Sequence, residues 1–132
     1  MGVLPTVRMH MDKRVCTLRP ETKIRDAVKL LVRNHVTGAP VVDENRKVVG
    51  ILTERDCLKL FAKGVEGDAI QGDVASFMTG EVTTIPPDVD VYYTAGLFLR
   101  HHFRRLPVVE DGKLVGAITR FDILRVIRSN LR

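Results

Sequence analysis

The sequence predicts an α/β protein built from two copies of one β-α-β-β-α unit, and three observations carry this prediction. The runs APVV at 39–42 and VGILTERD at 49–56 return as LPVV at 106–109 and VGAITRFD at 115–122. Pro40 and Pro107 are 67 residues apart, and Asp56 and Asp122 are 66 apart, so the second copy has one residue fewer in its turn. Apolar helical periods recur at matching places, and an Asp-Gly pair in the second copy is a strong hairpin signal. Such an internal duplication indicates two copies of one supersecondary unit.

The first copy is expected to open with a strand at 15–18. A helix then begins at Glu21 or Thr22 and ends near Asn34, because Ile24 and the apolar residues three, four and seven positions later form one face. Two β-branched runs, 39–42 and 48–52, flank a polar segment with the composition of a hairpin loop. A second helix is expected from Thr53 through Phe61.

The second copy repeats this order. A strand is expected at 82–85, a helix around 91–98, a hairpin that turns at Asp111-Gly112, and a last helix at 120–129. A one-turn helix is expected at 74–78, before the strand. The segment between the copies contains three glycines with acidic residues, which is typical of a linker. We therefore place the first repeat at 7–61, the linker at 62–73 and the second repeat at 74–129.

Size and composition favour one compact body. A repeat of about 55 residues is at the lower limit for an adequate core, so the two copies are expected to fold against each other about a pseudo-twofold axis. A hydrophobic content of 45% with 28% charged residues is ordinary for a soluble domain, and no apolar run approaches a membrane helix. Residues 1–14 lack the apolar core of a secretory signal, so we expect a cytoplasmic location. Cys16 and Cys57 are expected to be buried or half-buried thiols.

The doubled pattern closely resembles the cystathionine-β-synthase (CBS) domain pair, or Bateman module. The resemblance rests on a strand that ends in Thr, a helix, an apolar-Pro-Val-Val strand, and Gly-apolar-apolar-Thr-x-x-Asp before a helix, all present twice from about Met9 to Ile127. It implies a regulatory, usually non-catalytic module. Such modules bind adenosine-containing ligands, namely AMP, ADP, ATP or S-adenosylmethionine, in clefts between the two copies. They commonly form disc-like homodimers.

The Thr-x-x-Asp motif has two interpretations. At a helix start it is a capping box, in which the Thr hydroxyl accepts from a first-turn backbone N–H and the acid reaches back. A carboxylate at this place could also accept from the vicinal hydroxyls of a ribose, beside a helix N-terminus that favours phosphate. The resemblance implies ribose contacts for Asp56 and Asp122, with Thr53 and Thr119 near the ribose or phosphate. Both roles can coexist.

The segments before the two prolines differ between the copies. The second copy has Arg104 and Arg105 where the first has small, neutral residues. In modules of this kind each cleft combines the Thr-x-x-Asp of one copy with the pre-proline segment of the other. One cleft would then hold Thr53 and Asp56 with both arginines, whose guanidinium groups can donate bidentately to phosphate. The alternative is that these arginines are solvated surface charges. Further predicted lining residues of this cleft are Thr84, Ile85, Phe103, Leu106 and Arg55.

The other cleft would hold Thr119 and Asp122 with the pre-proline segment of the first copy. That segment supplies a hydroxyl and a glycine but no positive charge, so we expect this cleft to be weaker for phosphates. Its predicted lining residues are Thr119, Asp122, Val36, Thr37, Gly38, Ala39, Thr17 and Arg120.

Other functional classes find less support in the sequence. No Gly-x-Ser-x-Gly, His-Glu-x-x-His, Walker or dinucleotide-binding motif occurs, so we expect no enzymatic activity. His35, His101 and His102 lack partners at metal-ligand spacing, so we expect no metal site and no catalytic cofactor. The net charge of +5, and a basic face with Arg125, Arg128 and Arg132, leave a nucleic-acid-associated protein as an alternative. A dimerisation module with empty clefts is the other alternative.

The expected mechanism is regulatory. A ligand that bridges both copies can change their relative angle. It shifts the equilibrium between two arrangements only by the difference in its affinity for them. The sequence contains no output domain, so the regulated protein is expected to be a separate chain.

Overall fold

The computed structural model describes residues 4–131, and it divides into two compact units. Unit 1 comprises the N-terminal segment up to Val15 together with Thr83–Arg132, of which Arg132, expected on the basic face, lies outside the described residues. Unit 2 comprises Cys16–Val82. Met1–Val3, which belong to the segment tested for a signal sequence, also lie outside the described residues.

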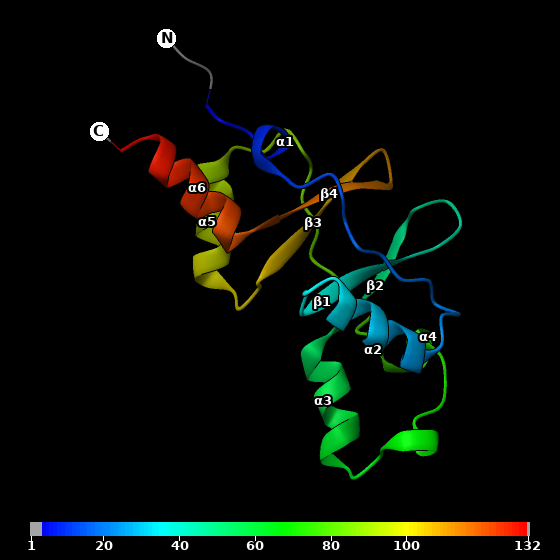
Figure 1. Cartoon of the computed structure of the whole chain (residues 1–132). Coiled ribbons are helices and arrows are strands. Elements are labelled where there is room, and N and C mark those ends of the chain that lie inside the picture. The colour runs from blue at the N-terminus through cyan, green and yellow to red at the C-terminus, as the bar shows by residue number, and fades with distance from the viewer. Residues whose placement is uncertain (1–3, 132) are drawn as a thin grey trace. The chain divides into compact units, whose positions relative to one another are not determined.

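Unit 2 contains one hairpin and its helices (Figure 1). In chain order, its elements are α2 (Ile24–Arg33), β1 (Gly38–Val42), β2 (Val48–Thr53), α3 (Glu54–Ala62), the 3₁₀ turn η1 (Gly67–Ala69) and α4 (Val74–Phe77). The strands pair antiparallel with Pro40 opposite Ile51. The core is formed by the apolar face of α2 and alternate strand residues, with Ile24 and Leu52 fully buried.

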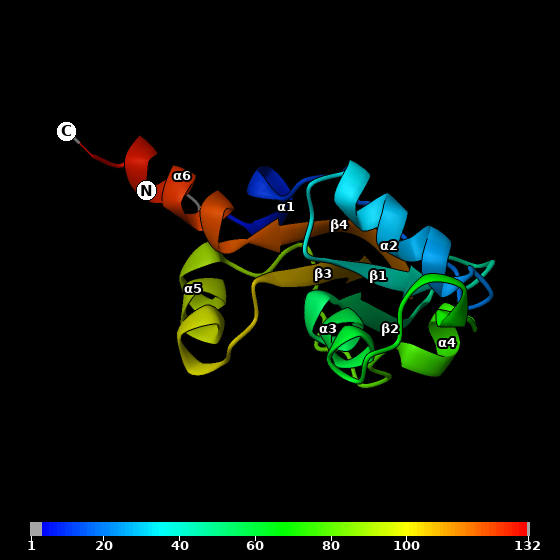
Figure 2. The same ribbon diagram turned by 60° about the horizontal axis from the view of Figure 1, so that its bottom comes forward.

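Unit 1 repeats this plan. In chain order, its elements are α1 (Val7–His10), α5 (Val91–Arg100), β3 (Arg105–Glu110), β4 (Lys113–Thr119) and α6 (Arg120–Ser129). Pro107 lies opposite Ala117 in the antiparallel hairpin. Asp111 and Gly112 turn the hairpin with positive φ angles of 52° and 78°, as the Asp-Gly signal predicts. Helices α5 and α6 pack side by side next to this hairpin (Figure 2).

The expected strands at 15–18 and 82–85 are wrong in extent. Each segment contributes a single residue to a parallel bridge, Leu18 with Val41 and Ile85 with Val108. In each case backbone hydrogen bonds of 2.9 and 3.0 Å flank the bridge. Pro40 and Pro107 have no N–H to donate to the carbonyls of Cys16 and Thr83, two residues before each bridge, so the ladder cannot extend back along the expected strands. The α/β fold with two repeated hairpin-helix units is otherwise confirmed, and α2 begins at Ile24, two to three residues later than expected.

The compact units do not coincide with the sequence repeats. The N-terminal segment packs on the second repeat: the N–H of Val7 donates to the carbonyl of Val89 and that of Arg8 to Pro87, both at 2.8 Å. The matching segment at α4 packs on the first repeat, where the N–H of Val74 donates to Thr22 at 2.8 Å. Each unit is therefore completed by the segment that leads into the other repeat. We call residues 7–15 the strap of unit 1.

The strap is held to unit 1 by side chains as well as by the backbone. Arg8 forms ion pairs with Asp88 and Glu110. Its hydrogen bond to Glu110 is the main cause that raises the pKa of its guanidinium, and its hydrogen bond to Asp88 is the next. Farther along, Asp12 and Ala117 exchange backbone hydrogen bonds of 2.9 and 3.0 Å. A Cβ at Gly116 would meet the Met11 sulfur at 2.7 Å and the Asp12 carbonyl oxygen at 2.9 Å. The strap thus approaches β4 closely because residue 116 has no side chain.

Substitution of Gly116 tests this approach. We expect Gly116→Val to push the strap away from β4 and to lower the free energy of unfolding by about 1–3 kcal/mol, the usual cost of overpacking. Urea unfolding measures the loss, and amide hydrogen exchange of residues 7–15 locates it. Gly80→Ala is the control, because a Cβ there meets nothing within 4 Å. Unchanged exchange in the strap of Gly116→Val would contradict this account.

Candidate functional site

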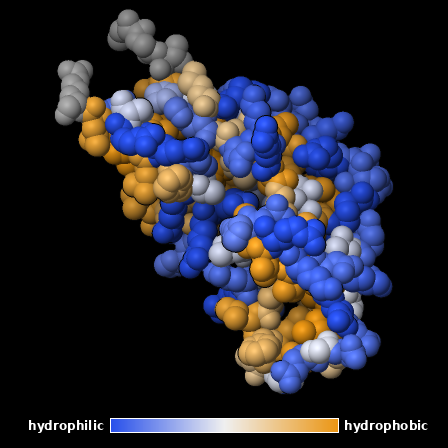
Figure 3. Space-filling view, viewed as in Figure 1, coloured by the Kyte–Doolittle hydropathy of each residue, from blue (hydrophilic) through white to orange (hydrophobic). Residues whose placement is uncertain are grey.

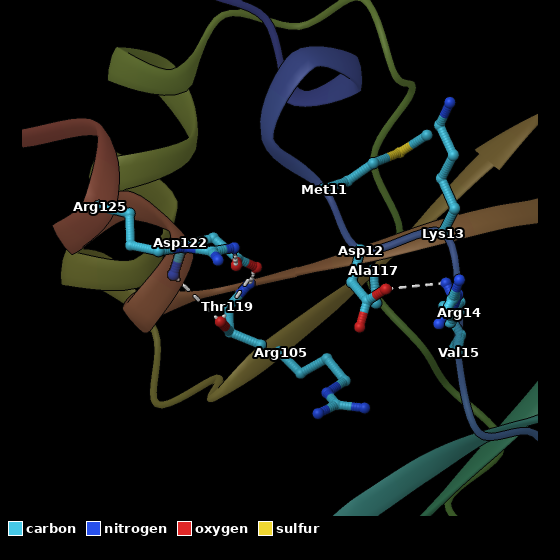
Figure 4. Close-up of a pocket in the computed structure, with 10 residues that line it drawn as sticks. All are labelled: Met11, Asp12, Lys13, Arg14, Val15, Arg105, Ala117, Thr119, Asp122 and Arg125. Atoms are coloured by element: carbon cyan, nitrogen blue, oxygen red, sulfur yellow. Dashed lines mark hydrogen bonds and ion pairs between the residues drawn. The ribbon is translucent and has the colours of Figure 1, made fainter. Parts of the chain in front are cut away.

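Unit 1 contains a pocket of about 630 Å³ between the strap, the hairpin and the start of α6 (Figure 4). This volume is in the range of small-molecule sites. The strap contributes five consecutive residues and the second repeat contributes the other five. The lining residues are Met11, Asp12, Lys13, Arg14, Val15, Arg105, Ala117, Thr119, Asp122 and Arg125. Three of them, Arg105, Thr119 and Asp122, are residues that the sequence predicts as ligand-binding.

The Thr-x-x-Asp motif of unit 1 is a complete capping box. The Thr119 N–H and hydroxyl donate to Oδ2 of Asp122 at 2.8 and 3.1 Å, and the Asp122 N–H lies 3.2 Å from the Thr119 hydroxyl oxygen. The other oxygen, Oδ1, accepts from the guanidinium of Arg125. Asp122 is only 5% exposed. The capping interpretation is therefore confirmed, and both carboxylate oxygens already have partners within the protein.

The strap places a second carboxylate at the same pocket. Asp12 is held there by its backbone bridge to Ala117, and its Oδ1 accepts from the N–H of Arg14 at 2.8 Å. Its side chain is exposed and lies between Arg105 and Arg14 in Figure 4. Unlike Asp122, Asp12 has an oxygen, Oδ2, that accepts no hydrogen bond within residues 4–131.

The cations of the pocket come from three elements. Arg105 on β3 lies directly opposite Thr119 in the hairpin register and is half-buried. Arg14 comes from the strap and Arg125 from α6, while the Lys13 side chain points away from Arg105 (Figure 4). Within residues 4–131, Arg14 and Arg105 form no side-chain hydrogen bond or ion pair, whereas Arg125 is bound to Asp122. Two guanidinium groups therefore remain available to an anion.

The strap residues and Arg125 were missed in the sequence, although a signal was present. Aligning the two leading segments sets MDKRV at 11–15 against MTGEV at 78–82. The two basic residues of the first segment, Lys13 and Arg14, have no basic counterpart in the second, where Glu81 matches Arg14. The sequence does not reveal that this segment packs on the second repeat, because no pattern within the segment indicates its long-range contacts.

The corresponding motif of unit 2 is also a capping box. Oδ2 of Asp56 accepts from the Thr53 N–H at 2.9 Å and from its hydroxyl at 3.1 Å. Its Oδ1 lies 3.5 Å from the hydroxyl of Thr79, the residue that matches Asp12. Asp56 is 8% exposed. Both motifs thus fix the start of a helix whether or not a ligand is bound.

Two residues expected in the second cleft line a different kind of pocket. Val36 and Thr37 border an apolar pocket of about 380 Å³ between α2, α3 and the segment after α3. Apolar residues surround a hollow in the lower part of Figure 3, where Figure 1 shows α3. Cys57 also lines the pocket; burial, and then the neighbouring Asp56 carboxylate, raise the pKa of its thiol. Cys16 and Cys57 are both half-buried thiols, as expected.

The remaining predicted residues are spread over both units. Ile85 and Leu106 have buried side chains in the core of unit 1, and Phe103 stacks on His101 with ring centroids 4.9 Å apart. Arg120 donates to the carbonyls of Phe98, His101 and Phe103 at 3.0–3.4 Å, so this side chain braces the end of α5. Thr84, Arg104 and Arg55 are exposed, Thr17 and Gly38 are half-buried, and Ala39 is buried.

The expected partnership of Thr53 and Asp56 with Arg104 and Arg105 joins residues of different units. It therefore stays a prediction, as does the partnership of Asp122 with Gly38. Within unit 1, the structure instead places Arg105 beside the Thr-x-x-Asp motif of its own repeat.

Residues 4–131 contain no group of three or more His, Cys, Asp or Glu side chains that could hold a metal ion. No helix within the same residues is long and apolar enough to cross a membrane.

Comparison with known proteins identifies both repeats. The CBS domain family matches residues 7–63 and again 73–129. The uncharacterized protein MJ1225 of Methanocaldococcus jannaschii is 31% identical over 124 residues, which is 94% of this chain and 43% of MJ1225. The chain thus spans less than half the length of the first curated relatives it matches.

Two solved structures share the whole fold. CBSX2 of Arabidopsis thaliana in complex with AMP has a TM-score of 0.85 and 34% identity, over 97% of this chain and 99% of that one. The CBS domain pair of protein MJ0100, in complex with 5′-methylthioadenosine and S-adenosyl-L-methionine, has a TM-score of 0.83 and 28% identity, over 98% of this chain and 100% of that one.

Loss of the capping carboxylate tests its structural role. We expect Asp122→Ala to lower the free energy of unfolding by about 1–2 kcal/mol without any ligand, because the cap of α6 is lost. Chemical denaturation measures the change. Glu66→Ala, at an exposed acidic residue in the segment after α3, serves as the control. Equal stability of the two variants would show that the capping box contributes little.

Proposed function

This chain belongs to the CBS domain family, and from that premise we propose that it is a regulatory module that binds an adenine nucleotide. The proposed ligands are AMP, ADP or ATP, with S-adenosylmethionine as the other adenosine-containing candidate. The observation that carries the proposal is the pocket of unit 1, where Arg14 and Arg105 accompany a capped Thr-x-x-Asp motif. The AMP complex of CBSX2 and the S-adenosylmethionine complex of MJ0100 support the ligand class.

The chemistry of the pocket suits a sugar phosphate. Guanidinium groups donate two parallel hydrogen bonds to phosphate oxygens, and such charge-assisted bonds are about twice as strong as neutral ones. The N-terminal end of the α6 dipole is favourable for an anion near the same place. Asp12 supplies an acceptor for sugar hydroxyls. We assign no catalytic residue, and ligand binding is proposed to act on a separate partner protein.

A homodimer is part of the proposal. Helices α5 and α6 expose large apolar side chains, of which Leu99 is 88% exposed and Phe121 is 65% exposed. Exposed apolar surface of this kind commonly marks a protein contact. A second copy that covers these helices would let a change within one module alter the surface of the dimer.

Ligand-dependent thermal stability tests the proposal. A nucleotide at 100 times its dissociation constant should stabilise the protein by about 2.7 kcal/mol, which raises the melting temperature by several degrees. We expect such a shift with at least one of AMP, ADP and ATP, and none with a short RNA. Arg105→Ala should weaken the phosphate-bearing ligands about tenfold or more, because a charge-assisted contact is lost.

Arg128→Ala is the matched control, since Arg128 is exposed on α6 and does not line the pocket. It should bind nucleotide as the wild type does. A wild type stabilised by RNA but by no adenosine compound would overturn the proposal in favour of a nucleic-acid-associated protein. No shift with any of these compounds would favour the purely structural module.

A further inference from the structure

We propose that the strap sets the ligand specificity of the unit 1 pocket, because Arg14 attracts ligand phosphates and Asp12 limits how many the pocket tolerates. The inference rests on the proposed function and goes beyond it by naming the specificity-determining residues. It also names the ligand class, an anionic nucleotide rather than the net-cationic S-adenosylmethionine.

The first step concerns which charges are available. Asp122 and Arg125 bind each other, and the other oxygen of Asp122 is used by Thr119. Their charges largely offset one another at the wall of the pocket. Apart from Lys13, which points away from Arg105, the remaining charges of the lining are those of Arg105, Asp12 and, on the far side of Asp12 from Thr119, Arg14 (Figure 4).

The second step concerns how the strap holds its charges in place. The backbone bridge from Asp12 to Ala117 fixes the strap against β4, and the turn from the Asp12 carboxylate to the Arg14 N–H fixes the next two residues. Arg14 and Asp12 are therefore positioned by backbone contacts. A ligand that meets these residues therefore does not have to order the backbone of the strap first.

The third step is the contrast with unit 2. The residues of unit 2 that match Asp12, Arg14, Arg105 and Arg125 are Thr79, Glu81, Gly38 and Lys59. With the shared aspartate, the unit 1 set carries three cations and two carboxylates, and the unit 2 set carries one cation and two carboxylates. The two repeats have the same capping box, so the difference lies in the charges around it.

The fourth step concerns the ligands. Adenosine, AMP, ADP and ATP share the same nucleoside and differ in phosphate charge, and a terminal phosphate carries about −1.5 to −2 at pH 7. S-adenosylmethionine has a sulfonium and an ammonium group against one carboxylate. In water, the interaction of two unit charges about 8 Å apart changes a binding affinity about twofold. Each further phosphate adds charge to the ligand, so the effect on affinity grows with the number of phosphates. The wild type should thus prefer ATP and ADP to AMP, AMP to adenosine, and adenosine to S-adenosylmethionine.

Isothermal titration calorimetry of the strap variants with these five ligands, at low and at high salt, tests the inference. Asp12→Asn keeps an oxygen that can accept from the Arg14 N–H but removes the charge. We expect it to tighten AMP about threefold and ATP about tenfold at low ionic strength, with adenosine changed less than about twofold. Arg14→Ala should act in the opposite direction, and salt should reduce both effects. Arg128→Ala is again the control.

The outcomes separate the inference from the proposed function. If adenosine and its phosphates bind equally well, or if both strap variants weaken every ligand by the same factor, the strap has only a structural role and the inference is overturned, while nucleotide binding stands. Preferential binding of S-adenosylmethionine by the wild type would likewise overturn it. Absence of binding by all five ligands would overturn both. Opposite, charge-graded shifts in the two variants would support it.

Discussion

The backbone bridge between Asp12 and Ala117 is the contact on which the candidate functional site in unit 1 depends. It fixes the strap against β4, and it can form because Gly116 leaves room for Met11 and for the Asp12 carbonyl. Without it, half of the lining of the unit 1 pocket would be absent. The same arrangement occurs in unit 2, where Gly50 adjoins Met78 and Thr79. A glycine at this place is therefore a requirement of the fold in both repeats.

Each Thr-x-x-Asp motif caps a helix, and this structural role does not require a ligand. Asp56 and Asp122 are buried and use their oxygens to hold the start of a helix. Any ligand that approaches must share these oxygens or use groups beside them. In unit 1 charged groups from the strap, from β3 and from α6 lie beside them, and we propose that these charges set the ligand specificity.

Much of the fold could be predicted from the sequence because its signals are local. The doubled pattern located both hairpins, and the Asp111-Gly112 turn and the helix after each Thr-x-x-Asp followed from turn and capping chemistry. The strands before the first helices were overestimated, since Pro40 and Pro107 have no N–H with which the pairing could extend back along them. The placement of the strap could not be predicted, because its contacts are with residues some 80 to 110 positions away. Arg14 was missed for the same reason. Arg125 was assigned to a basic face of the last helix, although it pairs with Asp122 three residues earlier, whereas Arg105 was found from the difference between the two copies.

Duplication followed by divergence of charge accounts for the site as a whole. Both repeats keep the glycine, the threonine and the aspartate that build the local geometry, and they differ in the charged residues around it, where we propose that a ligand binds. The most direct test of this account is a crystal structure of the protein with bound ATP. The account predicts phosphate oxygens within hydrogen-bond distance of the guanidinium groups of Arg105 and Arg14 in unit 1. ATP bound with its phosphates away from both groups, and with the strap still paired to β4, would contradict it.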